Sequence, residues 1–206
     1  DLDGTVTDPA VGITSAVQYS LRAMHRPVPD ASSLYSFIGP PLKASYRDLL
    51  GFTEKEAVEA IRLYREYYAE KGILENTVYP GIPSLLADLH RSRKILIIAT
   101  SKPTIFAKRI LAHFKLLPYF THVVGSNLDG SNVEKYAVIQ QALNLTGSSP
   151  SQCIMIGDRH FDINGAHQNR IQAVGVLYGY GSESELQACR PEYVAKDVSA
   201  LSAILL

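Results

Sequence analysis

The pattern of hydrophobic and polar positions divides the chain into two parts, in which apolar residues recur at different spacings. Between residues 13 and 70 apolar side chains recur every three to four positions, which is typical of amphipathic helices. Thr53 with Glu56 three residues later forms a capping-box pattern at the start of the longest of them. The helices predicted in this part cover residues 15–24, 31–37 and 42–50, and a last segment from residue 53 to the neighbourhood of Gly72.

After the turn sequence Tyr79-Pro80-Gly81 the pattern changes, and short apolar runs alternate with amphipathic segments. This alternation predicts a parallel sheet with helices on both faces, an α/β fold. The strands are expected at 95–100, 122–125, 153–157 and 173–176, and the helices at 85–90, 105–113, 134–143 and 161–169, with a weaker helix-strand-helix tail.

Composition excludes several classes of protein. Twenty basic residues balance twenty acidic ones, so the chain has no basic surface for a nucleic acid polymer or an anionic membrane. No apolar run approaches the roughly 20 residues of a membrane-spanning helix. Cys153 and Cys189 have neither the spacing of a thiolate metal site nor the number of a disulfide framework. A cytoplasmic protein is therefore expected.

Acidic and basic side chains gather where the predicted strands end. Asp1 and Asp3 stand one residue apart before Gly4, and Asp158 follows another apolar run with Asp162 four residues later. A third run ends in Thr100-Ser101-Lys102. In a parallel sheet ligands bind beyond the carboxyl ends of the strands, so these residues are expected to meet. Carboxylates together with a hydroxyl and lysines suit a magnesium-dependent site that handles phosphate.

With Lys135, these segments match in order the motifs of the haloacid dehalogenase superfamily of phosphohydrolases, and the chain resembles its phosphoglycolate phosphatase-like and 5'-nucleotidase-like members. The resemblance implies a Rossmann-like parallel sheet as the core domain, residues 1–10 and 80–206, with an inserted α-helical cap domain, residues 11–79. The family pattern also has a short apolar strand before the first Asp, so a few residues are expected upstream of Asp1.

The resemblance further implies a role for each core motif. Asp1 would be the nucleophile that becomes a phosphoaspartate, and Asp3 the acid and base. Mg²⁺ would be held by Asp1, the main-chain carbonyl of Asp3 and Asp158, with Asp162 nearby. Asp162 also suits a plain helix N-terminus.

Thr100 and the N–H of Ser101 would bind the phosphoryl group. Lys135 would neutralise charge on the nucleophile and the phosphate, a role for which Lys102 is a rival. Lys102 is also counted among the residues that bind substrate.

The cap would read the rest of the substrate. Residues 37–42 form a turn with Gly39 and Pro40, followed by Lys43 and Arg47, and these four residues are expected to contact the leaving group. A plain connection between two helices is the alternative. No role is assigned to His160 or to the Tyr178-Gly179-Tyr180-Gly181 segment.

These inferences predict a Mg²⁺-dependent phosphatase, a monomer or homodimer, acting on a small phosphorylated metabolite of the phosphoglycolate or nucleoside monophosphate class. The Ile-Gly-Pro-Pro turn and the Ala-Thr-Ser-Lys-Pro strand end favour the nucleotidase group slightly, and a sugar phosphate is also compatible. A phosphosugar mutase of the same fold and a non-catalytic module that binds a phosphorylated ligand stay open. Asp3 argues against dehalogenase chemistry, which lacks this second acid.

Overall fold

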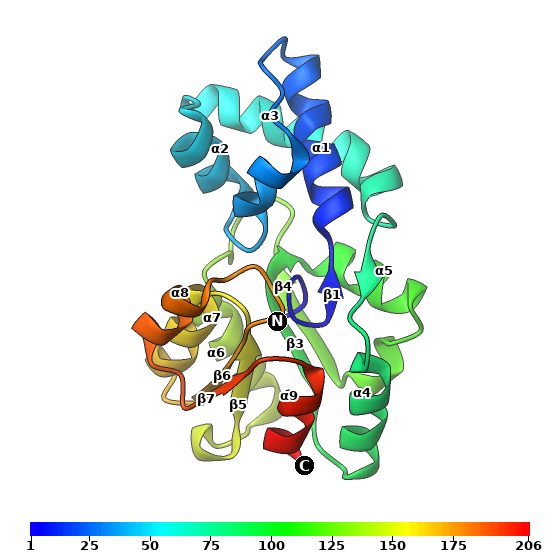
Figure 1. The fold of residues 1–206 in the computed structure, drawn as a ribbon, viewed down its shortest axis with the longest axis vertical. Helices are drawn as coiled ribbons and strands as arrows, with labels where there is room; N and C mark the ends of the chain where they lie inside the picture. The colour runs from blue at the N-terminus through cyan, green and yellow to red at the C-terminus, as the bar shows by residue number, and fades with distance from the viewer. The chain divides into compact units, whose positions relative to one another are not determined.

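The computed structural model describes residues 1–206, which form two compact units (Figure 1). The core unit contains Asp1–Asp8 and Val78–Leu206, and the insert unit contains Pro9–Thr77. The chain leaves the core unit after strand β1 (Thr7–Asp8) and returns through strand β2 (Thr77–Val78), and these two strands pair.

The insert unit is all-helical, as its apolar period predicted. It contains α1 (Ala10–Ala23), a 3-10 helix (Ala31–Phe37), α2 (Leu42–Leu50), α3 (Glu54–Tyr67) and a π-helical turn (Tyr68–Gly72). The capping box is confirmed, because Thr53 and Glu56 exchange hydrogen bonds between side chain and main chain. Tyr64 and Tyr68 are buried and stack on each other with ring centroids 5.2 Å apart, so both belong to the packing of this unit.

The core unit has the predicted alternation of strands and helices. Its strands are β3 (Ile97–Pro103), β4 (His122–Ser126), β5 (Ile154–Gly157), β6 (Gln172–Val176) and β7 (Tyr193–Ala195), and its helices are α4 (Ile82–Arg91), α5 (Thr104–His113), α6 (Lys135–Thr146), α7 (His160–Gln168), α8 (Glu183–Cys189) and α9 (Val198–Leu205). None of the helices has the length and apolar character needed to span a membrane.

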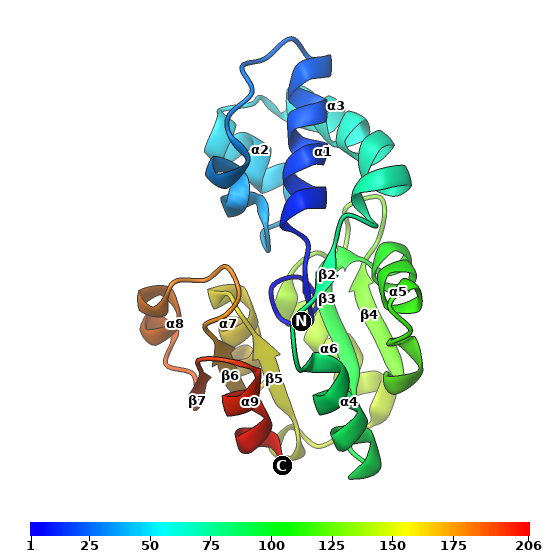
Figure 2. The ribbon, with the colours of Figure 1, turned by 45° about the vertical axis from the view of Figure 1, so that its right-hand side comes forward.

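All strand pairs among β3–β7 are parallel, but they form two sheets, β3-β4 and β5-β6-β7, where a single sheet was expected (Figure 2). Helices α6 and α7 share one buried hydrophobic cluster with strands of both sheets. Helices α4 and α9 pack against β6 and β7 in a second cluster. The fold is therefore an α/β sandwich with helices on both faces, and the carboxyl ends of its strands lie at one edge.

Strand β3 is longer than the pattern predicted. It runs past Thr100 to Pro103, because a register shift after Ala99 lets Pro103 pair with Ser126 of β4. Thr100 thus lies inside the strand and not at its end.

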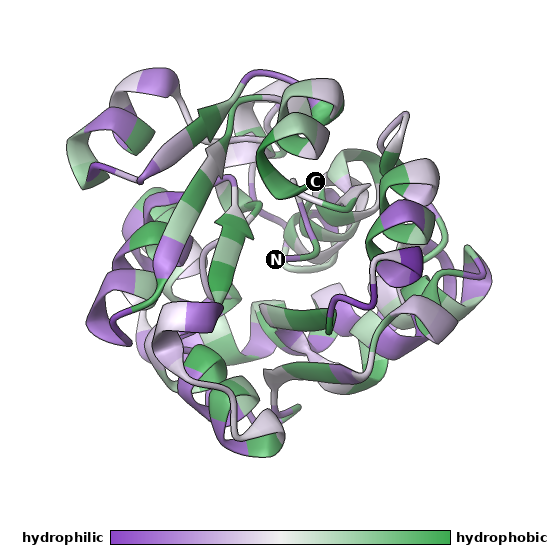
Figure 3. Cartoon of the chain, turned by 90° about the horizontal axis from the view of Figure 1, so that it is seen from below, coloured by the Kyte–Doolittle hydropathy of each residue, from purple (hydrophilic) through white to green (hydrophobic).

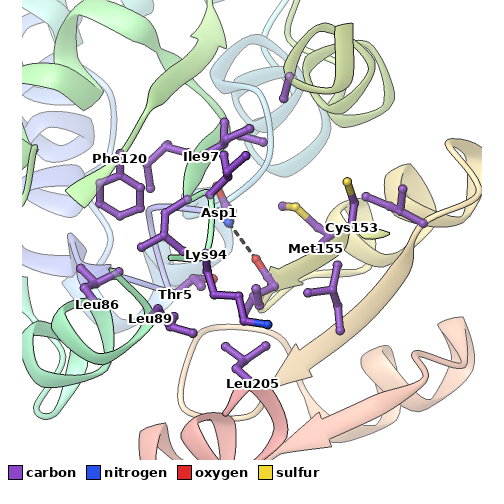
Figure 4. A pocket seen from close by; sticks show the side chains of 18 of the residues that line it. Asp1, Thr5, Leu86, Leu89, Lys94, Ile97, Phe120, Cys153, Met155 and Leu205 are labelled. Atoms are coloured by element: carbon purple, nitrogen blue, oxygen red, sulfur yellow. Dashed lines mark hydrogen bonds between the residues drawn. The ribbon is translucent and has the colours of Figure 1, made fainter. Parts of the chain in front are cut away.

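An apolar cavity of about 480 Å³ lies where β3 and β5 fail to pair (Figure 4). Its lining consists mainly of aliphatic side chains from α4, β3, α6, β5 and α9. Viewed from below, hydrophobic strand segments lie on two sides of the N-terminus (Figure 3). The main-chain nitrogen of Asp1 donates to the carbonyl of Ile156 at 2.7 Å, at the edge of β5. Because apolar side chains make up most of its lining, this cavity does not suit a phosphate.

Candidate active site

The first acidic segment is a tight turn that carries Asp1 and Asp3. Gly4 has φ +81°, a conformation that side-chain-bearing residues rarely adopt, and its N–H donates to the carbonyl of Thr7 at 2.8 Å. The N–H of Leu2 donates to Asp1 Oδ1 at 2.7 Å. Asp3 is 8% exposed and the side chain of Asp1 is 6% exposed, so the turn holds both carboxylates in largely buried positions.

The second acidic segment comes from β5 and α7. Asp158 directly follows β5, and Asp162 stands in the first turn of α7, where its Oδ2 accepts a hydrogen bond from the N–H of Arg159 at 3.1 Å. Asp158 and Asp162 are 1% and 0% exposed. A Cβ on Gly4 would lie 2.2 Å from Asp158 Oδ2, so only a glycine permits this close approach of the two segments.

Carboxylate oxygens of Asp1, Asp158 and Asp162 lie within 4.8 Å of one another. Three acidic groups from two segments more than 150 residues apart along the chain therefore converge, as the strand-end argument predicted.

Two buried lysines compensate part of this negative charge. Lys135, the first residue of α6, places its Nζ 2.9 Å from Asp1 Oδ1 and 2.8 Å from Asp162 Oδ1, and donates to the carbonyl of Ala99 at 3.1 Å. Lys102 forms an ion pair with Asp3 Oδ2 instead. The two rival lysines thus have different partners, and Lys135 is the one beside Asp1.

The site retains unmet negative charge. Burial, followed by the charge of Asp162, raises the pKa of Asp158 to about 7. Asp3 Oδ1 and Asp162 Oδ1 are buried and accept no well-aligned hydrogen bond. Close carboxylates with buried oxygens fit a hard divalent cation such as Mg²⁺, which prefers oxygen ligands.

The other residues predicted from sequence lie in different surroundings. Thr100 is 2% exposed and its hydroxyl accepts from the N–H of Lys102 at 3.2 Å. The hydroxyl of Ser101 donates to the carbonyl of Val133 at 2.9 Å. Both residues belong to the part of β3 that also carries Lys102.

Gly39, Pro40, Lys43 and Arg47 belong to the insert unit and are not among the residues that the core unit brings together. Lys43 and Arg47 both pair with Glu54 on the surface of that unit.

Sequence reasoning missed several contacts of this site. Tyr180 donates its main-chain N–H to Asp158 Oδ2 at 2.8 Å, and Thr5 Oγ1 lies 3.4 Å from Asp158 Oδ1. Glu185 of α8 accepts hydrogen bonds from the Arg159 side chain and from the main chain of His160, and its Oε1 lies 2.7 Å from His160 Nδ1. The repeated glycines around Tyr180 were the signal in the sequence for a close main-chain approach.

Known proteins resemble the chain over most or all of its length. It is 43% identical to a 5'-nucleotidase of Pseudomonas aeruginosa, over 100% of this chain and 93% of that protein. A crystal structure of a predicted phosphatase from Clostridium acetobutylicum is 46% identical with a TM-score of 0.97, covering 100% of this chain and 95% of that one. Tyrosine-protein kinase PtkA of Mycobacterium tuberculosis is 39% identical over 88% of this chain, but only 62% of its own length is matched.

The sequence model of haloacid dehalogenase-like hydrolases matches residues 1–176, a span that includes both acidic segments, Thr100 and Lys135. With this match, and with full-length relatives above 40% identity, the chain belongs to the haloacid dehalogenase-like hydrolase family.

Proposed function

We propose that this protein is a Mg²⁺-dependent phosphatase that hydrolyses a small phosphorylated metabolite through a phosphoaspartate on Asp1. One observation carries the proposal. Asp1, Asp158 and Asp162 converge within 4.8 Å, and Lys135 contacts two of them, while Asp3 lies beside the cluster with one buried oxygen that has no donor. This set provides a nucleophile, a cation site and an acid/base within one buried group.

Asp1, Asp158 and the main-chain carbonyl of Asp3 would hold the Mg²⁺, with Asp162 next to them. When bound, the ion supplies positive charge that stabilises the phosphoryl group during transfer. The buried oxygens of Asp3 and Asp162 and the raised pKa of Asp158 support a cation at this place.

The reaction proceeds in two steps. The Asp1 carboxylate attacks phosphorus and the bond from phosphorus to the ester oxygen breaks. Asp3, which must carry a proton at this point, gives that proton to the ester oxygen. Asp3 then takes a proton from water, whose oxygen attacks the phosphorus of the phosphoaspartate and releases phosphate and free Asp1.

Lys135 stabilises negative charge on Asp1 and on the transferred group throughout, because its Nζ lies 2.9 Å from Asp1 Oδ1. Thr100 and Ser101 are proposed to bind the phosphoryl oxygens, and Lys102 to bind substrate beside Asp3.

The insert unit is proposed to act as the cap that selects the substrate, with Gly39, Pro40, Lys43 and Arg47 as its contacts. The name of the Pseudomonas aeruginosa relative supports a nucleoside monophosphate as the substrate class. Phosphoglycolate is the second class to be tested.

The experiment is phosphate release from a panel of phosphorylated metabolites, with Mg²⁺ or with EDTA. The panel contains nucleoside monophosphates, phosphoglycolate, hexose phosphates and phosphotyrosine. Release that requires Mg²⁺ and favours one class supports the proposal and identifies the class. A lack of release from every compound contradicts it, and isomerisation of a sugar phosphate primed by a bisphosphate would then identify a mutase.

A further inference from the structure

The loop at residues 177–182, between β6 and α8, contacts both acidic segments of the site. The hydroxyl of Tyr178 donates to the carbonyl of Thr5 at 3.0 Å, and the hydroxyl of Tyr180 donates to Asp8 Oδ1. The main-chain N–H of Tyr180 donates to Asp158 Oδ2 at 2.8 Å. One loop thus connects the turn that carries Asp1 and Asp3 with the carboxylate of Asp158.

The main chain of this loop lies directly against Asp158. A Cβ on Gly179 would be 2.3 Å from the Cβ of Asp158 and 2.4 Å from the carbonyl oxygen of Gly4. A Cβ on Gly181 would be 1.9 Å from the carbonyl oxygen of Asp158. These separations are far below van der Waals contact, so a side chain at either position would displace Asp158 or the loop.

The two tyrosines anchor the loop. The ring of Tyr178 packs edge-on against Tyr79 with centroids 4.9 Å apart. Burial raises the pKa of the Tyr178 phenol, which therefore keeps its proton and its donor role at neutral pH. Tyr180 adds an anchor at Asp8, the last residue of the core unit before the chain enters the insert unit.

We propose that Tyr178 and Tyr180 are positioning residues that hold the 177–182 loop against Asp158 and thereby fix this carboxylate for Mg²⁺. The inference rests on the proposed function, because it concerns the affinity of the same cation site. The N–H of Tyr180 fixes the orientation of the Asp158 carboxylate, and the two hydroxyls fix the position of that N–H. Groups that orient a metal ligand typically change metal affinity about 10- to 100-fold when they are removed.

The test measures Mg²⁺ binding to the metal-free protein by calorimetry, and the rise of the melting temperature with Mg²⁺ concentration. The variant Tyr178→Phe/Tyr180→Phe keeps both rings and the main-chain donor but loses the two hydroxyls. Its Mg²⁺ dissociation constant is expected to rise about tenfold, while kcat at saturating Mg²⁺ falls much less. Tyr193→Phe, at an exposed tyrosine of β7, is the matched control and should bind Mg²⁺ as the wild type does.

A second variant separates positioning from general loss of stability. Gly181→Ala should weaken Mg²⁺ binding at least as much, because its Cβ collides with Asp158. Gly147→Ala, at the end of α6 with φ +63° and open space around it, should lower the melting temperature without changing Mg²⁺ affinity. If the double variant does not fold, Mg²⁺ binding is measured on the single variant Tyr180→Phe instead.

An unchanged Mg²⁺ dissociation constant in a folded tyrosine variant would overturn the inference and leave the proposed function intact. Failure of the wild-type protein to bind Mg²⁺ would contradict the proposed function itself.

Discussion

Asp158 shows how much the site depends on charge balance at single residues. Its carboxyl is almost fully buried next to Asp162, and both conditions disfavour the ionised form. Lys135 contacts Asp1 and Asp162, so one cation serves two of the three carboxylates in the cluster. Without a metal ion the site therefore has more negative than positive charge, and protonation of Asp158 relieves part of its repulsion with Asp162.

This balance predicts a pH-dependent affinity for Mg²⁺. Burial and the nearby charge of Asp162 raise the pKa of Asp158 from its usual value of 3.8 to about 7 in the folded metal-free protein. Between these two pH values the folded protein therefore holds a proton that the unfolded chain has lost. The contribution of this proton to the stability of the fold is complete below about pH 4, and it is lost as the pH rises through about 7. Mg²⁺ needs the ionised carboxylate, so its affinity should rise with pH and level off above about pH 7.

Calorimetric Mg²⁺ titrations between about pH 5 and about pH 9 check this prediction, with an affinity that falls roughly tenfold per pH unit on the acid side. Mg²⁺ affinity that stays constant across this range would show that Asp158 is ionised throughout.

At the scale of elements, the insert unit presents two cations next to the Gly39-Pro40 turn. Lys43 and Arg47 are about half exposed and share Glu54 as their partner. Exposed ion pairs contribute little to stability, so an anionic substrate could replace Glu54 at small cost.

If these cations contact substrate, Lys43→Ala/Arg47→Ala should raise KM about tenfold, as expected for the loss of charge-assisted hydrogen bonds, with a smaller effect on kcat. Arg62→Ala is the matched control, because Arg62 is an exposed arginine of the same unit that pairs with Glu59 and Glu66. Steady-state kinetics on the preferred substrate give the KM and kcat values that test this prediction. Equal KM values for the double variant and the wild type would reduce both residues to surface ion pairs.

Local features such as strand ends and helix caps could be predicted from the sequence, but contacts between distant segments could not. Asp158 and Asp162 were predictable because they follow an apolar run, and the capping box at Thr53 because both of its residues are local. The residue pattern alone could not assign a partner to each lysine, because the partner depends on how α6 and β3 meet the first acidic turn. Only the family resemblance indicated that Lys135 lies beside Asp1. The 177–182 loop was missed for the same reason, since its contacts with Thr5 and Asp158 cross more than 20 residues of sequence.

At the scale of the whole molecule, the cavity between β3 and β5 is the main departure from the expected single sheet. Both strands have an unpaired edge there, and the main-chain nitrogen of Asp1 already bonds to Ile156 at the edge of β5. A parallel strand that passes through the cavity and ends at Asp1 would pair with both edges and bury the aliphatic lining.

An extension of about five apolar, β-branched residues before Asp1 should therefore stabilise the core unit. A net gain of about 2 kcal/mol corresponds to a rise in melting temperature of about 4–8 °C for a chain of this size. Thermal unfolding of this variant is compared with that of a variant carrying a Gly/Ser extension of equal length. Equal melting temperatures for the two extensions would contradict the pairing of a strand in the cavity.

The proposed mechanism depends on attack of Asp1 on phosphorus, which is tested by the turnover of Asp1→Asn on the substrate that the wild type prefers. Asparagine has nearly the same shape but cannot form the phosphoaspartate. The kcat of Asp1→Asn should fall at least about a thousandfold at saturating Mg²⁺, in a variant that remains folded. A folded Asp1→Asn variant with kcat within about tenfold of the wild type would contradict the covalent mechanism.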